Sequence, residues 1–335
     1  MNKTKGLDFI KRYTMILVLI VVTAFFAWRT GGAILLPMNV SSLISQNAYV
    51  FILATGMLLC ILTGGNIDLS VGSVVCFVGA IGAVLMVNMK MNMWLAILIM
   101  FVIGTLIGAF QGFWIAYVRI PPFIVTLAGM FFARGMTTIV HTDPFNVQNK
   151  AFVALKDTRV IVPGMGSVNR IGKYVDAYVE IGVIVALLIV VLMFVMLRWS
   201  KLGRAFYAVG GNKQSALMLG INVKRTRFLA QLFSGVLAGI AGYVYFLHVG
   251  SGSASHATGM EMNAIASSII GGTLLTGGVG NIIGTFFGVL SLSTIQNIVS
   301  SAGLDQAWWT GITIAAMLCL FLVIQSIVMA RKNRG

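Results

Sequence analysis

Two acidic side chains stand within long apolar stretches of the chain. Asp68 lies in the segment "TGGNIDLSVGS" (63–73), and Glu261 lies in "GMEMNAIASS" (259–268). A carboxylate inside a membrane costs at least about 2.5 kcal/mol and normally faces a cavity or a partner. Asp68 could carry a proton, act at a gate or cap the helix that follows it. Glu261 has the same alternatives, and with Asn263 it could line the outer mouth of a pathway.

Consecutive glycines interrupt apolar sequence at two places, one in each half of the chain. The first place is 63–73, and the second is "IIGGTLLTGGVGNIIGT" at 269–285. Paired glycine-interrupted segments indicate a transport site, because unwound backbone at membrane depth is tolerated only where protein buries it or a cavity adjoins it. Most other glycines fit close helix packing. The predicted gate glycines are Gly64, Gly65, Gly271, Gly272, Gly277 and Gly278.

Sequence motifs for enzyme chemistry are missing from the chain. It has no G-x-x-x-x-G-K-[ST] segment for ATP, no Ser-His-Asp order, no paired carboxylates and no Cys-x-x-Cys. We therefore expect no catalytic residue, no metal site and no cofactor bound by this chain. Energy for transport has to come from an ion gradient or from a partner.

The amino-acid composition indicates which kind of structure holds these polar residues and glycines in place. Of the 335 residues, 59% are hydrophobic and 9% are charged, which is typical of an integral membrane protein. We predict an all-α polytopic protein, with one transmembrane domain over 1–335 and no separate soluble domain. Apolar runs long enough to span a bilayer give ten candidate spans, at 14–29, 41–62, 69–88, 92–118, 122–140, 178–199, 227–249, 261–277, 281–302 and 307–329.

The distribution of charge orients these spans. Lys and Arg total 23 against 8 Asp and Glu, and basic residues gather at both ends and in the loop 200–226, so the positive-inside rule places both termini in the cytoplasm. No small-residue cleavage site follows the first apolar run, so we expect it to be an uncleaved helix. The segment 141–177 then forms an extracytoplasmic loop, folded or with short helices, that connects spans or offers a surface to a soluble partner.

Two of the predicted spans are irregular. The span 41–62 opens with the polar stretch "SSLISQNAY", and 261–277 is short and rich in glycine, so either one could be broken or re-entrant. When the spans are counted from span 2 and from span 7, the chain crosses the membrane in opposite directions on its way to the two glycine clusters. This order suggests an inverted repeat of spans 2–5 and 7–10.

The cytoplasmic loop 200–226 contains a pattern for a short helix. In "KQSALMLG" (213–220), Asn212 can cap the helix start and Gly220 can stop it. A short amphipathic helix exposed to the cytosol invites docking of a partner. The alternative, a basic loop lying on the membrane, explains the charge but not the capped helix.

Four segments of the sequence resemble those of a known protein family. The segments "GGNIDLSVGS", "FIVTLAGMFFARG", "YAVGGNKQSALMLGINV" and "ASSIIGGTLLTGGVGNIIGTFFG" look like those of the permease subunits of bacterial ABC importers for monosaccharides, the ribose/galactose/xylose class. The first half looks most like the multiple-monosaccharide permeases, and the second half is closer to the galactofuranose type. The likeness runs from about residue 14 to 329.

The resemblance implies an importer of several subunits in the bacterial cytoplasmic (inner) membrane. Two permeases, identical or sister chains, form the pathway. Two cytoplasmic ABC ATPases bind ATP and Mg²⁺, and an extracytoplasmic sugar-binding protein delivers a pentose or hexose such as galactose, xylose, ribose or galactofuranose. The helix at 211–221 corresponds to the coupling helix that docks on the ATPase. Its candidate residues are Gly211, Asn212, Ser215, Ala216 and Gly220.

A solute rich in hydroxyl groups requires hydrogen-bonding groups rather than charges. The candidate pathway residues are therefore Asn47, Asn66, Asp68, Ser70, Glu261 and Asn263. The sequence departs from the family at Asn66, which follows the glycine pair, and at Asn263, where aspartate is common. The competing hypothesis is a proton-coupled secondary transporter of a small polar solute that uses Asp68 or Glu261. It leaves the helix at 213–220 unexplained.

Overall fold

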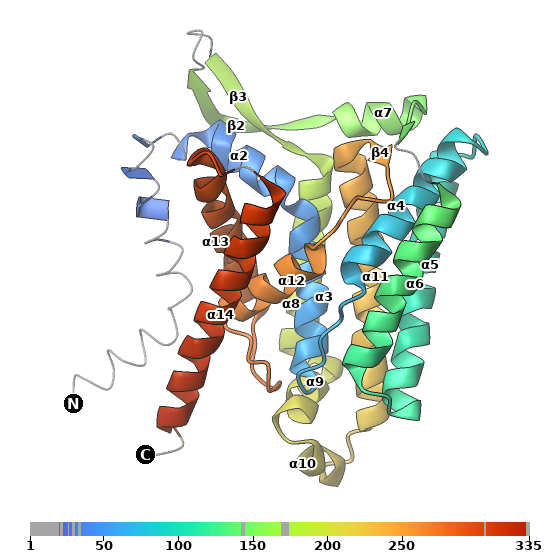
Figure 1. Cartoon of the computed structure of the whole chain (residues 1–335), viewed down its shortest axis with the longest axis vertical. Coiled ribbons are helices and arrows are strands. Elements are labelled where there is room, and N and C mark those ends of the chain that lie inside the picture. Colours follow the sequence, from blue (N-terminus) through green and yellow to red (C-terminus); the bar gives the residue numbers. More distant parts are fainter. Residues whose placement is uncertain are drawn as a thin grey trace.

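The computed structural model of the chain is mostly helical (Figure 1). It describes residues 35–141, 145–168, 174–304 and 306–332, together with short pieces between 20 and 32. The predicted first span, 14–29, and the basic residues before it lie largely outside the described residues. The helices are α2 (Pro37–Gln46), α3 (Ala48–Leu62), α4 (Val71–Val87), α5 (Met93–Phe113), the π-helix η2 (Trp114–Val118), α6 (Pro122–Val140), α7 (Lys150–Asp157), α8 (Ile181–Trp199), α9 (Lys201–Gly211), α10 (Lys213–Met218), α11 (Val223–Val249), α12 (Met260–Ile270), α13 (Ile282–Ser301) and α14 (Ala307–Lys332).

Several of these helices can cross a membrane. Within the described residues, five are long and apolar enough to do so, namely Met93–Val118, Pro122–Val140, Ile181–Trp199, Val223–Val249 and Ile282–Ser301. The bent pair of α2 and α3 adds a sixth, and α4 and the middle of α14 are shorter apolar helices. Short helices α9 and α10 lie at one end of the bundle, opposite the β2–β3 hairpin (Figure 1). The polytopic membrane architecture is confirmed.

The two irregular spans are both broken. The segment 41–62 splits into α2 and α3, which meet at 51°, because Asn47 has non-helical dihedral angles, φ −107° and ψ 8°. Its side-chain Nδ2 donates to the carbonyl oxygen of Leu43 at 2.8 Å. The segment 261–277 contains only α12, which has 11 residues and is too short to span a bilayer. It ends where Gly272 takes φ +88°, a left-handed conformation that favours glycine.

The chain is not entirely helical, so the all-α prediction is wrong in one region. The segment predicted as an external loop holds α7 and two strands, β2 (Arg159–Val168) and β3 (Tyr174–Glu180), which pair antiparallel. A second small pair joins β1 (Phe145–Asn146) to β4 (Ser251–Gly252). Valine in both arms, Ile161 in β2 and two tyrosines in β3 suit a pleated surface, whereas Pro163 and Gly164 are typical of a loop.

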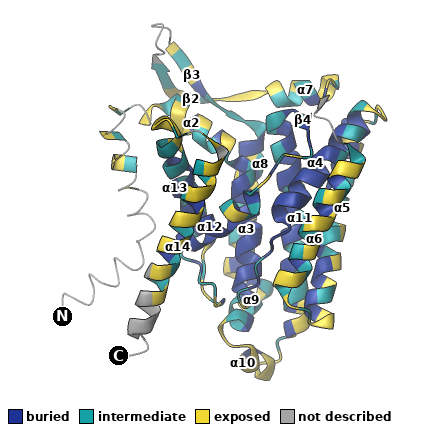
Figure 2. Cartoon of the chain, in the orientation of Figure 1, coloured by how far each residue is buried: buried dark blue, intermediate teal, exposed yellow. Residues whose placement is uncertain are grey.

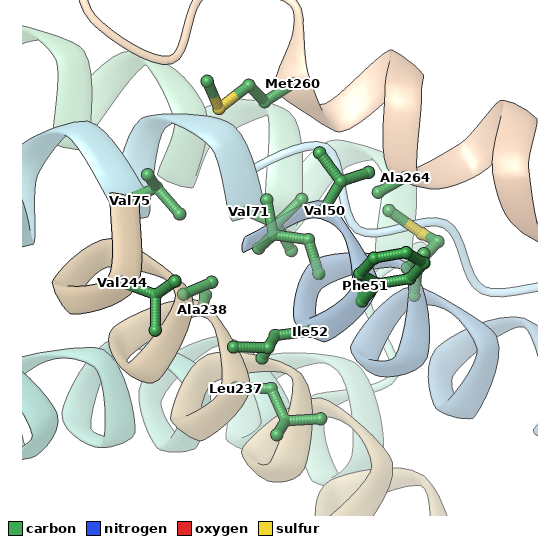
Figure 3. Packing of buried hydrophobic residues seen from close by; sticks show 14 of the residues in the cluster. Val50, Phe51, Ile52, Val71, Val75, Leu237, Ala238, Val244, Met260 and Ala264 are labelled. Carbon is green, nitrogen blue, oxygen red and sulfur yellow. The ribbon is translucent and has the colours of Figure 1, made fainter. Parts of the chain in front are cut away.

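Helix α3 forms the centre of the bundle. Every residue of α3 except Tyr49 is buried, and a helix that is apolar on all sides belongs in an interior. Figure 3 shows Phe51 and Ile52 of this helix beside Leu237 of α11 and Ala264 of α12. Figure 2 shows the exposed residues on the outer helices, where apolar side chains suit contact with lipid.

Helices α5 and α11 cross closely through four glycines. A Cβ atom added to Gly108 would lie 2.7 Å from the Cα of Gly235, and one added to Gly104 would lie 2.7 Å from the Cα of Gly239. Real Cβ atoms do not approach backbone so closely. The two G-x-x-x-G spacings therefore bring the helix backbones into contact, which is a common way to join helices within a bilayer.

This crossing gives a first prediction. Gly235→Ala adds a methyl group that overlaps the Cα of Gly108, and we expect it to destabilise the fold by about 1–3 kcal/mol. Gly135→Ala in α6 is the matched control, because nothing lies within 4 Å of the added Cβ. Thermal unfolding of the two purified variants in detergent measures the difference. Equal midpoints would contradict the close crossing.

Candidate functional site

The loop 63–70 runs from the end of α3 back to the start of α4 inside the bundle (Figure 1). Gly64 and Gly65 open it with φ of +121° and +74°, which residues with a Cβ rarely adopt. Thr63, Asn66 and Asp68 are all buried. Backbone without helical bonds is tolerated at this depth only because protein surrounds it.

Asp68 is held by hydrogen-bond donors rather than by a positive charge. Its Oδ1 accepts from the backbone N–H of Ser70 at 3.0 Å and from the Ser70 hydroxyl at 2.6 Å. Its Oδ2 accepts from Nε2 of Gln231 at 2.5 Å and from the hydroxyl of Ser234 at 2.8 Å. Hydrogen bonds of this kind take the place of water around a buried carboxyl group.

The network continues through Gln111 of α5. Its Nε2 donates to the Ser70 hydroxyl at 2.9 Å, and its Oε1 accepts from Nε2 of Gln231 at 3.0 Å. These five side chains are at most 3% exposed. We call them the Asp68 network: Asp68, Ser70, Gln111, Gln231 and Ser234. It fastens the unwound loop to α5 and α11, which explains why an acid is tolerated here.

The capping role considered for Asp68 is not what the structure shows. The N-cap residue of α4 is Ser70, and it makes no side-chain capping bond. Of the backbone N–H groups in the described chain, Asp68 accepts only that of Ser70, two residues on, because its second oxygen is directed to α11.

Glu261 lies against the same helix start. A Cβ at Gly72, in the first turn of α4, would overlap Oε2 of Glu261. That oxygen is buried without a hydrogen-bond partner among the described residues. Arg134 of α6 donates to the nearby carbonyl oxygens of His256 and Ala257, at 2.6 and 2.8 Å. Asp68 and Glu261 thus both lie beside the start of α4.

The other candidate pathway residues divide into two groups. Asn66 is 7% exposed, and its Nδ2 donates to the Thr63 hydroxyl at 3.3 Å, so it belongs with the buried loop. Asn47 and Asn263 are partly exposed and both bond to α13. Their Oδ1 atoms accept from the Ser293 hydroxyl at 2.6 Å and from Nε2 of Gln296 at 3.0 Å. The structure therefore does not gather all six residues into one site.

The glycine clusters meet the cytoplasmic loop at one place. A Cβ at Gly65 would overlap the carbonyl oxygen of Leu275, and one at Gly277 would lie 2.7 Å from the Cα of Gly64. One at Gly278 would lie 2.5 Å from the amide nitrogen of Gly211, and one at Gly210 would overlap the carbonyl oxygen of Leu62. We call this contact the glycine junction: Gly64, Gly65, Gly210, Gly277 and Gly278.

Two hydrogen bonds reinforce the junction. The N–H of Gly278 donates to the carbonyl oxygen of Leu62 at 3.0 Å, and the hydroxyl of Tyr207 in α9 donates to the carbonyl oxygen of Gly280 at 2.9 Å. A tyrosine hydroxyl is protonated and able to donate at neutral pH, and burial raises the pKa of Tyr207 further. Gly271 and Gly272 lie apart from the junction, where the end of α12 contacts Thr285 of α13.

The short helix predicted at 213–220 is present as α10. Oδ1 of Asn212 accepts from the N–H groups of Gln214 and Ser215, both at 2.9 Å. Gly220 ends the segment with φ +76°. Ala216 is buried against Val209 and Val223, so it attaches α10 to its neighbours.

Residues 39–322 match the family described as branched-chain amino acid transport system / permease component. The chain belongs to this permease family. It is 37% identical over 286 residues to the inner membrane ABC transporter permease protein YjfF of Escherichia coli (85% of this chain, 83% of that protein). It is 39% identical over 292 residues to the fructose import permease protein FruG of Bifidobacterium longum (87% and 83%), and 32% identical over 370 residues to the xylose transport system permease protein XylH of Escherichia coli (96% and 93%). No solved structure matches the chain.

These relatives confirm the predicted kind of protein. The permease is a multi-pass protein of the bacterial inner membrane and a component of an ABC importer, as the resemblance indicated. Its relatives are permease subunits and not enzymes. The proton-coupled alternative is not favoured. Among the described residues, no group of three or more His, Cys, Asp and Glu could hold a metal ion.

Several residues of the site were not predicted from the sequence. Gln111, Gln231 and Ser234 complete the Asp68 network, and their signal was a polar side chain inside an apolar span, with Gln231 and Ser234 three residues apart on one face. Leu217, Met218 and Leu219 of the α10 segment are 54%, 82% and 77% exposed. Only the structure shows that these apolar side chains are exposed at the end of the bundle.

Proposed function

We propose that this permease moves a monosaccharide into the cell as the membrane subunit of an ATP-driven importer. The support is the set of relatives, whose names specify import or transport of fructose and xylose and import of ribose. The substrate is an uncharged pentose or hexose, which suits a pathway of amides and hydroxyls rather than charges.

The proposal includes a topology of ten spans with both termini in the cytoplasm and an inverted repeat of spans 2–5 and 7–10. It is supported by the placement of the basic α9–α10 segment at one end of the bundle and of the β2–β3 hairpin at the other (Figure 1). By the positive-inside rule, the α10 end faces the cytoplasm, and the hairpin end faces the sugar-binding protein.

The observation that carries the proposal is the glycine junction. It joins α9, which leads directly into α10, to the unwound loop after α3 and to the turn after α12 through close backbone contacts, and the Tyr207 hydroxyl adds one side-chain bond. A movement of α10 is therefore transmitted to the loop after α3 and to the turn after α12 through rigid backbone contacts. Such a connection suits a subunit that is driven from outside by two ATPases holding ATP and Mg²⁺.

The candidate pathway residues take different roles in this proposal. Asn47 and Asn263, which are partly exposed beside α13, offer amides to sugar hydroxyls. The buried Asp68 network holds the unwound loop, so Asp68 and Ser70 position the pathway and do not contact sugar in this conformation. The pathway itself lies between two permease subunits, of the same or a sister chain.

Docking of the ATPase on α10 gives a testable result. Met218→Asp and Leu219→Asp place a charge on the exposed tip without disturbing buried contacts. We expect tagged wild type to co-purify with the ATPase from its native membrane and either variant to retain about a tenth as much or less, as for a truncated hot spot. Ile161→Asp, which changes a 60% exposed residue of β2, is the matched control and should retain the ATPase.

Two further variants separate docking from folding of the helix. Ala216→Asp puts a charge under α10, and Gly220→Pro forbids the positive φ at its end. Both should release the ATPase by displacing the helix. If the Met218 and Leu219 variants keep the ATPase while inserting normally, α10 is not the docking helix and the proposed function weakens sharply.

A further inference from the structure

A cavity beside the cytoplasmic end of α11 has features that ATPase docking does not require. It has a volume of about 820 Å³ and lies between the η2–α6 turn, α10 and the first turns of α11. Four cationic side chains line it, and no acidic residue of the described chain does. These cations are Arg119, Lys213, Lys224 and Arg227.

Arg227 is the most informative of these side chains. Its Nε is buried without a hydrogen-bond partner among the described residues, and no ion pair is formed by its guanidinium within the described ranges. One of its terminal nitrogens lies 3.0 Å from the position that a Cβ on Gly64 would take. The positive-inside rule explains basic residues on this side of the membrane, but not a partly buried arginine left without an anion.

Arg119 lines the same cavity and has an unusual backbone conformation. It closes η2 with φ +69° and ψ 28°, a left-handed conformation that is uncommon outside glycine. Two prolines follow it at the start of α6. π-Helical turns often occur at functional sites, and this one directs the chain so that Arg119 lines the same cavity as Arg227.

The position of the cavity at the ends of membrane spans indicates which kind of anion it binds. η2 and the first turn of α11 are ends of two candidate membrane spans, and aromatic rings gather there, with Trp114 packed on Phe113 and Tyr117 packed on Phe228. Aromatic side chains of this kind mark the boundary between hydrocarbon and headgroups. Apolar walls from Ile115, Ile120 and Leu217 adjoin the cations.

We infer that this cavity binds the phosphate headgroup of an anionic phospholipid from the cytoplasmic leaflet. Basic pockets between transmembrane helices on this side suit such headgroups. The phosphate ester would pair with Arg119 and Arg227, and the glycerol and first acyl carbons would lie along the apolar walls. The lipid would thereby contact α10 and the η2–α6 turn together.

The test compares lipid retention in matched variants. The full permease and its Arg119→Gln, Arg227→Gln and double variants are reconstituted in nanodiscs of phosphatidylethanolamine with phosphatidylglycerol, and bound lipid is measured by native mass spectrometry. We expect wild type to retain phosphatidylglycerol preferentially and each single variant to lose about fivefold in affinity. Arg225→Gln is the control, because Arg225 is an exposed neighbour on α11 that does not line the cavity.

Several outcomes would overturn the inference. An equal loss in the Arg225 variant would indicate general surface charge. Displacement of the lipid by millimolar glycerol 3-phosphate or inorganic phosphate would indicate a soluble anion. Normal lipid retention together with loss of the ATPase in the Arg119 variant would indicate a protein-docking site. Arg119 is exposed, so its substitution keeps the test interpretable if the Arg227 variant folds poorly.

Discussion

Asp68→Ala will destabilise the permease by about 3–5 kcal/mol, because it removes the acceptor for three side-chain donors at once. The Ser70 hydroxyl, the Gln231 amide and the Ser234 hydroxyl all donate to this carboxylate. None of them can turn to water, since each residue is at most 3% exposed. The unwound loop also loses its attachment to α11, so transport should fall together with stability.

The measurement is the midpoint of thermal unfolding of the purified protein, which we expect to fall by roughly 6–10 °C. The control adds Gln231→Leu and Ser234→Ala to Asp68→Ala, removing two of the donors as well. Replacing both partners of a buried hydrogen bond costs less than stranding one of them. The triple variant should therefore be more stable than Asp68→Ala alone, and a strictly additive loss would contradict the network.

Gly210→Ala will reduce sugar uptake by about tenfold or more, because an added methyl group at a close backbone contact costs about 1–3 kcal/mol or forces the junction apart. Its Cβ would overlap the carbonyl oxygen of Leu62. The neighbouring Gly211→Ala is the matched control, since nothing lies within 4 Å of that Cβ. Both positions are in the last turn of α9.

Uptake of labelled sugar into cells or proteoliposomes, together with ATPase activity of the complex, measures this effect. We expect Gly210→Ala to keep the ATPase bound and hydrolysing while uptake is lost, because α10 itself is unchanged. Gly211→Ala should transport like wild type. Equal uptake by both variants would show that the junction does not transmit motion.

Local features of the fold could be predicted from the sequence. The capping by Asn212 and the stop at Gly220 involve neighbouring residues, so the pattern was sufficient to place α10. The break at Asn47 was indicated by the polar residues before it. The short, glycine-rich segment after Glu261 likewise indicated a helix that does not span.

Contacts between distant residues could not be predicted in this way. Asp68 meets Gln231 across 163 residues of chain and Ser234 across 166, and nothing in the local pattern around Asp68 specifies those partners. The β2–β3 hairpin was missed for a related reason, because strand pairing depends on register between separate segments. The glycine clusters were identified, but their meeting with Gly210 depends on how α9 folds back.

The most direct test of the central claim is sugar uptake by proteoliposomes that contain the permease, its ATPase and its sugar-binding protein. We expect uptake to require ATP, to stop when the ATPase is replaced by a variant unable to hydrolyse it, and to continue in the presence of a proton uncoupler. Uptake that persists without ATP and is abolished by the uncoupler would contradict it.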